Sequence, residues 1–292
     1  MAWQQFVMQL DALPPDTVEE IFQRHGAHSV TLSDAGDSPV LEPAPGETPL
    51  WPETQISGLF SHGADLAALR DELLRCCKLR ALPAHRIEAL PERDWVTEWR
   101  RDSRPLRFGR RLWVAPDDFV PQDDAAVVLR LDPGLAFGSG THATTALCLE
   151  WLDGLSLQGL RLLDYGCGSG ILSLAALKLG AHAACAVDID PQAITATRAN
   201  ARRNSVAERL TALRDGAQLA GQFDVVIANI LAGPLTELAP ALCACMHSGS
   251  KLALSGILDT QADAVMQAYR PWIEFQPVVT QAGWVRLTGV RN

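Results

Sequence analysis

The sequence has no long hydrophobic run and no basic targeting segment. No apolar stretch in its 292 residues approaches the roughly 18 residues that a membrane-spanning helix needs. The first residues, MAWQQFVMQLDALPPD, lack the basic region followed by an apolar region that marks a signal peptide. We therefore expect a chain that acts in the cytoplasm and has no membrane contact.

Metal-binding and disulfide patterns are also missing. The seven cysteines are an odd number scattered through apolar segments, which is typical of reduced structural thiols in a cytosol. No CxxC pair occurs, and no histidine stands at ligand spacing beside the close pairs Cys76 and Cys77 or Cys243 and Cys245. The sequence therefore predicts no metal site and no disulfide framework.

Positive charge is in deficit. The chain carries 25 Lys and Arg against 34 Asp and Glu, for a formal net charge of -9. Because extended binding of nucleic acid needs a basic face, this balance argues against it. One stretch departs from the average, the arginine-rich DWVTEWRRDSRPLRFGRR at residues 94–111. A solvated connecting segment and a direct RNA contact both fit this composition, and we predict a linker over residues 96–120.

Before this linker, the chain alternates strand-like runs with amphipathic helices in the order β-α-β-β-α-β. That order is ferredoxin-like, so we predict a small α+β domain over residues 1–95. A surface loop is expected at residues 36–52, which are rich in Pro, Gly and acidic residues. The predicted strands are WQQFVMQL, SVTLSDA, TQISGLF and HRIEALPE, and the predicted helices are DTVEEIFQRHG and ADLAALRDELLRCC.

From residue 121 the strands are nearly continuous apolar runs and most are separated by helical segments, which is typical of a doubly wound parallel sheet. The last two runs, FQPVVTQ and WVRLTGV, are separated only by Ala282 and Gly283, a spacing that permits a hairpin but no helical crossover. A parallel sheet closed by an antiparallel last strand resembles the Rossmann-like methyltransferases. We therefore predict an α/β domain of that seven-stranded kind over residues 121–292.

The stretch DYGCGSG, residues 164–170, joins one of these strands to an apolar helical segment. A glycine-rich turn in this place binds anions or nucleotides, because backbone N–H groups and a helix N-terminus face the ligand. The nicotinamide fingerprint G-x-G-x-x-G would need a third glycine where Ile171 stands. The motif is instead D-x-G-x-G-x-G, beginning Asp164, Gly166, Gly168, which resembles the first motif of S-adenosylmethionine-dependent methyltransferases.

Further polar residues follow the next strands. Asp188 stands about 20 residues after the glycine loop, where an acidic residue accepts hydrogen bonds from ribose hydroxyls. Asn229 ends the strand FDVVIAN at the mouth of the same crevice, although an Asn that only caps a turn is the alternative. Asp190 before Pro191 has the pattern of a helix N-cap. The pair Asp215–Gly216 fits either a wall of an adenine pocket or a simple turn.

The segment DPGLAFGSGTHATTALCLEWL, residues 132–152, extends the resemblance from the methyltransferase superfamily to one family. Together with LLDYGCGSGILSLAALKLGA, VDIDPQAI and ANILAGPLTELAP, it closely resembles the PrmA family of bacterial ribosomal protein L-eleven methyltransferases, over nearly the whole chain. The most specific pieces are FGSGTHATT and NILAGPL. The family usually has Thr where Ser139 stands and Pro where Ala143 stands, and the second change removes only a helix-start preference.

The resemblance implies a class I methyltransferase with S-adenosylmethionine as its cofactor. Asn229 is the predicted catalytic residue, expected to accept hydrogen bonds from the reacting amine. His142 has no acidic partner beside it in the sequence, so we expect it to position other groups rather than to react. The predicted cofactor-binding residues are Phe137, Thr145, Asp164, Gly166, Gly168, Asp188 and Asn229.

The same resemblance implies methyl transfer to lysine side-chain amines and the N-terminal α-amine of ribosomal protein L-eleven of the large subunit. It also implies that residues 1–95 recognise that protein, with no direct RNA contact required. Two other functions stay open. One is a methyltransferase of the same fold that acts on RNA or on a small amine, and the other is a cofactor-binding module without catalysis.

Overall fold

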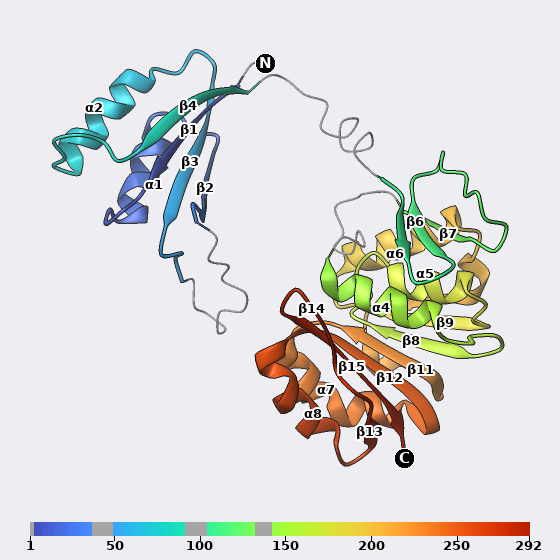
Figure 1. The fold of residues 1–292 in the computed structure, drawn as a ribbon. Coiled ribbons are helices and arrows are strands. Elements are labelled where there is room, and N and C mark those ends of the chain that lie inside the picture. Colours follow the sequence, from blue (N-terminus) through green and yellow to red (C-terminus); the bar gives the residue numbers. More distant parts are fainter. Residues whose placement is uncertain (1–2, 37–48, 91–103, 132–141) are drawn as a thin grey trace. The chain divides into compact units, whose positions relative to one another are not determined.

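The computed structural model describes residues 3–36, 49–90, 104–131 and 142–292. The chain divides into two compact units, Met1–Trp95 and Val96–Asn292, and each has a sheet and a core of its own (Figure 1). Most of the surface loop predicted for residues 36–52 lies outside the described ranges. Within those ranges, no helix is long and apolar enough to cross a membrane.

The N-terminal unit has the predicted element order. Its antiparallel sheet has the strand order β2-β3-β1-β4, the ferredoxin-like arrangement. Phe6 and Met8 of the central strand β1 pack against Ile21 and Phe22 of α1 and Leu69 of α2, and all five are fully buried. The elements are β1 (Trp3–Gln9), α1 (Pro15–Arg24), β2 (Ser29–Asp34), β3 (Thr54–Ser61), α2 (Leu66–Cys76) and β4 (His85–Leu90).

The main sheet of the second unit has the order β10-β9-β8-β11-β12-β15-β13, and β15 alone runs antiparallel to its neighbours on this path. This confirms the predicted seven-stranded sheet with an antiparallel last strand. The order reverses at β8, which lies between β9 and β11. The strands are β8 (Arg161–Tyr165), β9 (Ala183–Val187), β10 (Leu210–Leu213), β11 (Phe223–Asn229), β12 (Met246–Leu258), β13 (Ile273–Phe275) and β15 (Trp284–Arg291).

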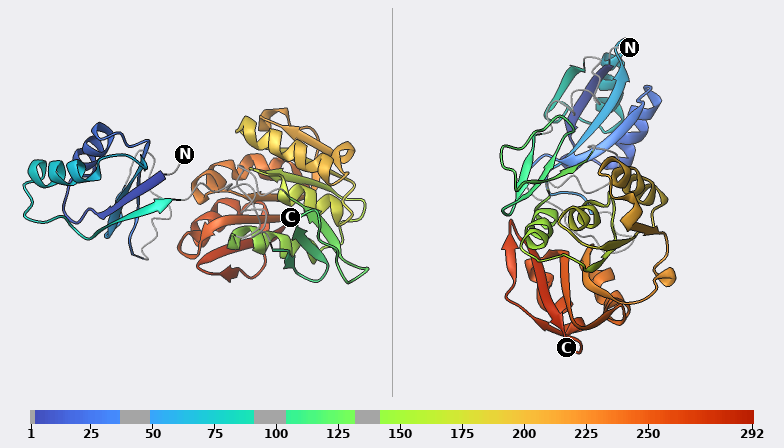
Figure 2. Two further views of the ribbon diagram at one scale, coloured as in Figure 1. Left: turned by 90° about the horizontal axis from the view of Figure 1, so that it is seen from above. Right: turned by 90° about the vertical axis from the view of Figure 1, so that its right-hand side faces the viewer.

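Helices cover both faces of this sheet (Figure 1; Figure 2). Successive strand residues point to opposite faces, so Leu162 and Ile227 pack with α4, α5 and α6, whereas Leu163 and Val226 pack with α7 and α8. Asp190 accepts a hydrogen bond from the N–H of Gln192 at 2.8 Å, which confirms its predicted N-cap role. The helices are α4 (Ala143–Asp153), α5 (Ile171–Lys178), α6 (Pro191–Arg203), α7 (Ala232–Ala244) and α8 (Ala262–Tyr269).

A small sheet precedes the main one. Strands β5 (Leu106–Phe108) and β6 (Leu112–Ala115) pair with each other, and β6 also pairs with β7 (Val127–Arg130). Phe108 and Leu112 are buried in the core that contains α4 and α5. Part of the segment 96–120, which the composition suggested as a linker, is therefore folded into the second unit. Strands of three and four residues carry too little apolar pattern to be recognised among arginines.

The C-terminal hairpin differs in detail from the prediction. The run FQPVVTQ is not one strand: its first residue, Phe275, ends β13, and its last three form β14 (Val279–Gln281). Both strands pair with β15. The hairpin turn between β14 and β15 is the predicted pair Ala282 and Gly283, which have φ of +51° and +79°. Two positive φ values in a two-residue turn match the twist of the flanking strands.

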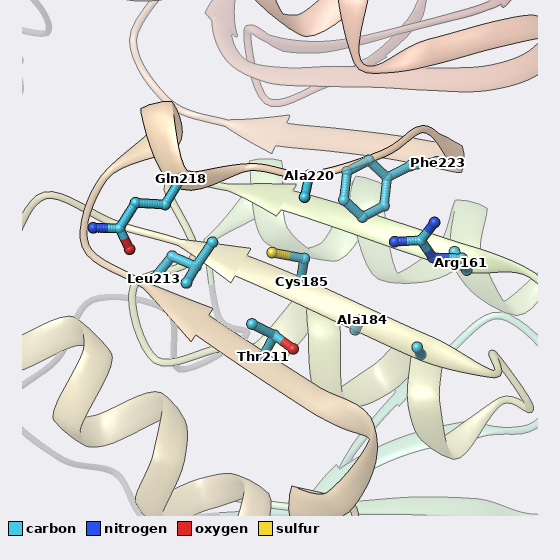
Figure 3. A pocket seen from close by; sticks show the side chains of 9 residues that line it. Arg161, Ala184, Cys185, Thr211, Leu213, Gln218, Ala220 and Phe223 are labelled. Carbon is cyan, nitrogen blue, oxygen red and sulfur yellow. The ribbon is translucent and has the colours of Figure 1, made fainter.

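One face of the sheet is partly bare. The connection between β10 and β11 contains only the single-turn helix η2 (Gly216–Gln218), and a groove of about 280 Å³ lies between it and the strands (Figure 3). At one end of the groove, the Arg161 guanidinium lies 5.0 Å from the Phe223 ring centroid. None of the predicted site residues lines this groove.

Candidate functional site

The predicted site residues meet where the strand order reverses. Asp164 lies near the end of β8 and the glycine loop follows it; Asp188 directly follows β9, and Asn229 ends β11. Because these three strands are parallel neighbours, their carboxyl ends form one crevice. Open α/β sheets bind their ligands at this switch point.

The glycine loop requires glycine for its backbone and for its contacts. Gly166, Gly168 and Gly170 have φ of +80°, +52° and +80°, a region that L side chains rarely adopt. A Cβ atom on Gly166 would also lie 2.2 Å from Cγ2 of Ile230. Gly170 begins α5 with no side-chain cap, so the first N–H groups of that helix are left for other partners.

Asp188 ties the end of β9 to the glycine loop. Its Oδ2 accepts a hydrogen bond from the N–H of Gly168 at 2.8 Å, and its Oδ1 accepts one from the N–H of Asp190 at 3.0 Å. An ionised carboxylate offers about four acceptor sites, so each oxygen retains capacity for a ligand hydroxyl. These two hydrogen bonds therefore hold Asp188 at the crevice and leave its carboxylate able to accept further hydrogen bonds.

Asp164 is fully buried beneath the loop. Its Oδ2 accepts hydrogen bonds from the N–H and the hydroxyl of Ser173 at 3.0 and 2.8 Å. Its Oδ1 has no partner among the described residues. Burial raises the pKa of this carboxyl to about 6, although the two bonds from Ser173 act to lower it. A buried carboxylate oxygen without a hydrogen bond lowers stability, and such an oxygen can accept a hydrogen bond from a donor group of a ligand.

Cys167 lies in the same loop and is almost completely buried. Its Sγ and the Thr197 hydroxyl are 3.5 Å apart. Burial raises the pKa of the Cys167 thiol well above its usual range.

Asn229 and Thr145 come together from distant parts of the sequence. The Nδ2 of Asn229 donates to Oγ1 of Thr145 at 3.4 Å, and Thr145 is buried in the first turn of α4. His142 is the N-cap of that helix, since its ring nitrogen accepts from the N–H of Thr144. Phe137 lies outside the described residues.

The segment after Asn229 is held by a glycine that the sequence analysis did not select. Gly256 has φ of +82° at a bulge in β12, and a Cβ there would lie 2.4 Å from the carbonyl oxygen of Ile230. Ile230 is therefore confined between Gly166 and Gly256. A lone glycine within the apolar strand KLALSGIL is the signal that could have identified this close approach.

Asp215 and Gly216 form a turn. Asp215 accepts from the N–H of Ala217 at 2.8 Å and so caps η2. A Cβ on Gly216 would lie 2.8 Å from the Tyr165 hydroxyl, so this glycine also allows a close contact. The turn interpretation explains both residues.

Known proteins resemble this chain along its whole length. The sequence matches the family described as Ribosomal protein L11 methyltransferase (PrmA) over residues 2–292. It is 50% identical to the Ribosomal protein L11 methyltransferase of Methylococcus capsulatus over 291 residues, covering 99% of each chain. It is 48% identical to the protein of that name from Klebsiella pneumoniae over 293 residues, covering 100% of each.

A solved structure agrees in fold. The ribosomal protein L11 methylase of Lactobacillus delbrueckii subsp. bulgaricus is 32% identical and superposes with a TM-score of 0.60. The match covers 64% of this chain and 98% of that one.

The confinement of Ile230 predicts an unequal response of two glycines in β12. Gly249→Ala should cost only the left-handed backbone strain, about 1–2 kcal/mol of unfolding free energy, because nothing lies within 4 Å of a Cβ there. Gly256→Ala should cost about 1–3 kcal/mol more, because its Cβ would overlap the Ile230 backbone. Urea unfolding of both variants measures the difference, and equal losses would contradict the contact.

The buried carboxyl of Asp164 predicts that its replacement by Asn stabilises the protein more at high pH than at low pH. The pKa of Asp164 in the folded protein, about 6, exceeds the unfolded value of about 3.9. The native state therefore loses stability relative to the unfolded state as the pH rises through this window, and the loss is complete above it. Asn carries no charge, so Asp164→Asn should stabilise the protein by about 1 kcal/mol more at pH 8 than at pH 5. Thermal unfolding at both pH values would contradict this if the effect were constant.

Proposed function

This chain belongs to the ribosomal protein L11 methyltransferase (PrmA) family, and on that premise we propose that it transfers methyl groups from S-adenosylmethionine to amines of ribosomal protein L11. The acceptors are lysine side-chain amines and the N-terminal α-amine. The proposal rests on one observation: the chain matches, along its whole length, relatives named ribosomal protein L11 methyltransferase. This match also disfavours RNA or a small amine as the methyl acceptor.

The crevice residues fit the cofactor, which supplies a methyl group on a positively charged sulfonium. The glycine loop has the left-handed backbone that lets a ligand approach the main chain, and Asp188 can accept the ribose hydroxyls. The unpartnered Oδ1 of Asp164 suits the positive charge or a donor group of such a molecule. Thr145 and Asn229 complete the predicted set, with Phe137 assigned by family resemblance alone.

The acceptor must lose a proton before it reacts. A lysine amine with a pKa of about 10.4 lies about 3.4 units from neutrality at pH 7, a cost of roughly 4.6 kcal/mol, whereas an α-amine near 7.7 costs about 1 kcal/mol. Desolvation beside a cation lowers the amine pKa, and the proton can leave to water. This reaction therefore needs alignment of amine and methyl group more than a dedicated base.

Asn229 is our candidate for that alignment. Its Nδ2 donates to the Thr145 hydroxyl, and its Oδ1 has no hydrogen-bond partner among the residues that the structure describes. We assign to Oδ1 the hydrogen bond from the acceptor amine, which aims the nitrogen lone pair at the methyl carbon. His142 acts on this geometry through the start of α4 and does not take part in proton transfer.

The two units have different proposed roles. We assign recognition of the ribosomal protein to residues 1–95 and catalysis to the second unit, with the intervening linker beginning at residue 96. Arg107 and Arg111 already contact Trp113 and Asp153 within the second unit, so no RNA contact is assigned to them. We place the reaction in the cytoplasm, where a bacterial ribosomal protein is made and assembled.

The direct test is mass spectrometry of purified ribosomal protein L11 after incubation with this enzyme and S-adenosylmethionine. We expect methyl groups on lysines and on the α-amine, located by peptide fragmentation. Cofactor binding without any methylation of L11 would contradict the proposed substrate and return the question to RNA or small amines.

Two variants should separate cofactor binding from methyl transfer. Asp188→Ala should weaken S-adenosylmethionine binding about ten-fold or more, because it removes charge-assisted hydrogen bonds. Asn229→Ala should reduce turnover about 100-fold with a smaller change in affinity, because it removes alignment. Calorimetry gives the affinities and a methylation assay gives the turnover.

Asp190→Ala is the matched control for this comparison. It removes a neighbouring carboxylate and the α6 cap, at a cost of about 1 kcal/mol of stability, but keeps the N–H that Asp188 accepts. Equal affinity losses in the two aspartate variants would contradict a ribose role for Asp188, and normal turnover in Asn229→Ala would contradict its role in alignment.

A further inference from the structure

Trp284 lies at the same sheet edge as Asn229. It is the first residue of β15, and because β15 is antiparallel to β12, it pairs with Leu258 at the carboxyl end of that strand. Asn229 pairs with Ser255 of the same strand. Two strand spacings, about 10 Å, therefore separate the β11 and β15 backbones. Trp284 also lies further than Asn229 along the strand direction, because Leu258 follows Ser255 toward the carboxyl end of β12.

The Trp284 side chain points toward the face that carries α4. Val285 and Leu287 are buried with α7 and α8, so the residues between and before them point the opposite way. The Trp284 indole meets the His142 ring edge to face, with centroids 4.9 Å apart. His142 is the N-cap of α4, and Thr145 in the first turn of α4 accepts the hydrogen bond from Asn229. The Trp284 indole therefore lies beside the first turn of α4, and it is partly exposed.

One acidic residue lies beside the turn that precedes this indole. The N–H of Asp259 donates to the carbonyl oxygen of Gly283 at 3.0 Å, which places Asp259 directly beside the hairpin turn before Trp284. Asp259 and Asp263, in the first turn of α8, are both exposed. The ring face of a partly exposed indole attracts organic cations, and it also offers a flat apolar surface for a methylene chain.

We propose that Trp284 is a lysine-recognition residue of the acceptor site. Its indole face attracts the ammonium group of an incoming lysine and then packs against the methylene stem when the amine reaches Asn229. This inference rests on the proposed function and adds to it a residue that distinguishes the two kinds of acceptor amine. An α-amine has no methylene stem, so it gains little from this surface.

The test compares initial methylation rates at individual sites of ribosomal protein L11, measured by peptide mass spectrometry at pH 8.5. At this pH an α-amine is mostly neutral, whereas a lysine is still cationic. Trp284→Ala should lower kcat/KM at lysines about ten-fold, mainly through KM, and change α-amine methylation less than about two-fold. Trp284→Phe should recover part of the lysine rate.

Trp272→Ala is the matched control, because Trp272 is a partly exposed tryptophan at the opposite end of β15, beside Asn292. It should leave both rates unchanged, and cofactor affinity by calorimetry should be normal in every variant. Equal losses at lysines and at the α-amine would assign Trp284 a structural role, and unchanged lysine rates would exclude contact. Absence of methylation by the wild-type enzyme would overturn the proposed function itself.

Discussion

The site depends on one steric constraint, the confinement of Ile230 between two glycines. On one side its side chain meets Gly166 of the ligand loop, and on the other its backbone meets Gly256 of β12. Both glycines have positive φ, so their backbones already exclude most L side chains. Asn229 directly precedes Ile230, so the position of the candidate catalytic amide is set by packing against the same loop to which we assign cofactor binding. The glycine loop and Asn229 are thereby fixed relative to each other by van der Waals contacts of Ile230.

Much of this arrangement followed from local sequence pattern. The apolar runs around Leu163 and Val226 predicted parallel strands because they are buried on both faces, and Asp190 before Pro191 predicted a helix start because both preferences are local. Three features did not follow. The short strands β5 and β6 are defined by pairing with β7, the run FQPVVTQ divides where it crosses to a second position on β15, and Gly256 matters only because Ile230 lies next to it in space. Each depends on contacts between distant residues, which periodicity does not encode.

Hydrogen bonds hold the candidate residues of the crevice in fixed positions. Asp188 is held by two backbone N–H groups, Asn229 by a buried threonine, and Thr145 by a helix whose N-cap is His142. Asp164 is the exception, because one oxygen of its buried carboxylate has no partner in the described part of the chain. A buried carboxylate oxygen without a hydrogen bond lowers the stability of the folded protein, and buried groups with shifted pKa values cluster at functional sites. The buried carboxyl of Asp164 is thus a local loss of stability beneath the glycine loop.

The buried thiol of Cys167 has a chemical consequence of its own. A sulfonium methyl donor alkylates sulfur nucleophiles, and Cys167 lies in the glycine loop to which we assign binding of that donor. The nucleophile is the thiolate, and burial keeps this thiol protonated by raising its pKa. The Thr197 hydroxyl beside it further restricts its approach to other groups. In the proposed complex, burial therefore keeps the cysteine of this loop in its unreactive thiol form and so protects the enzyme from methylating itself.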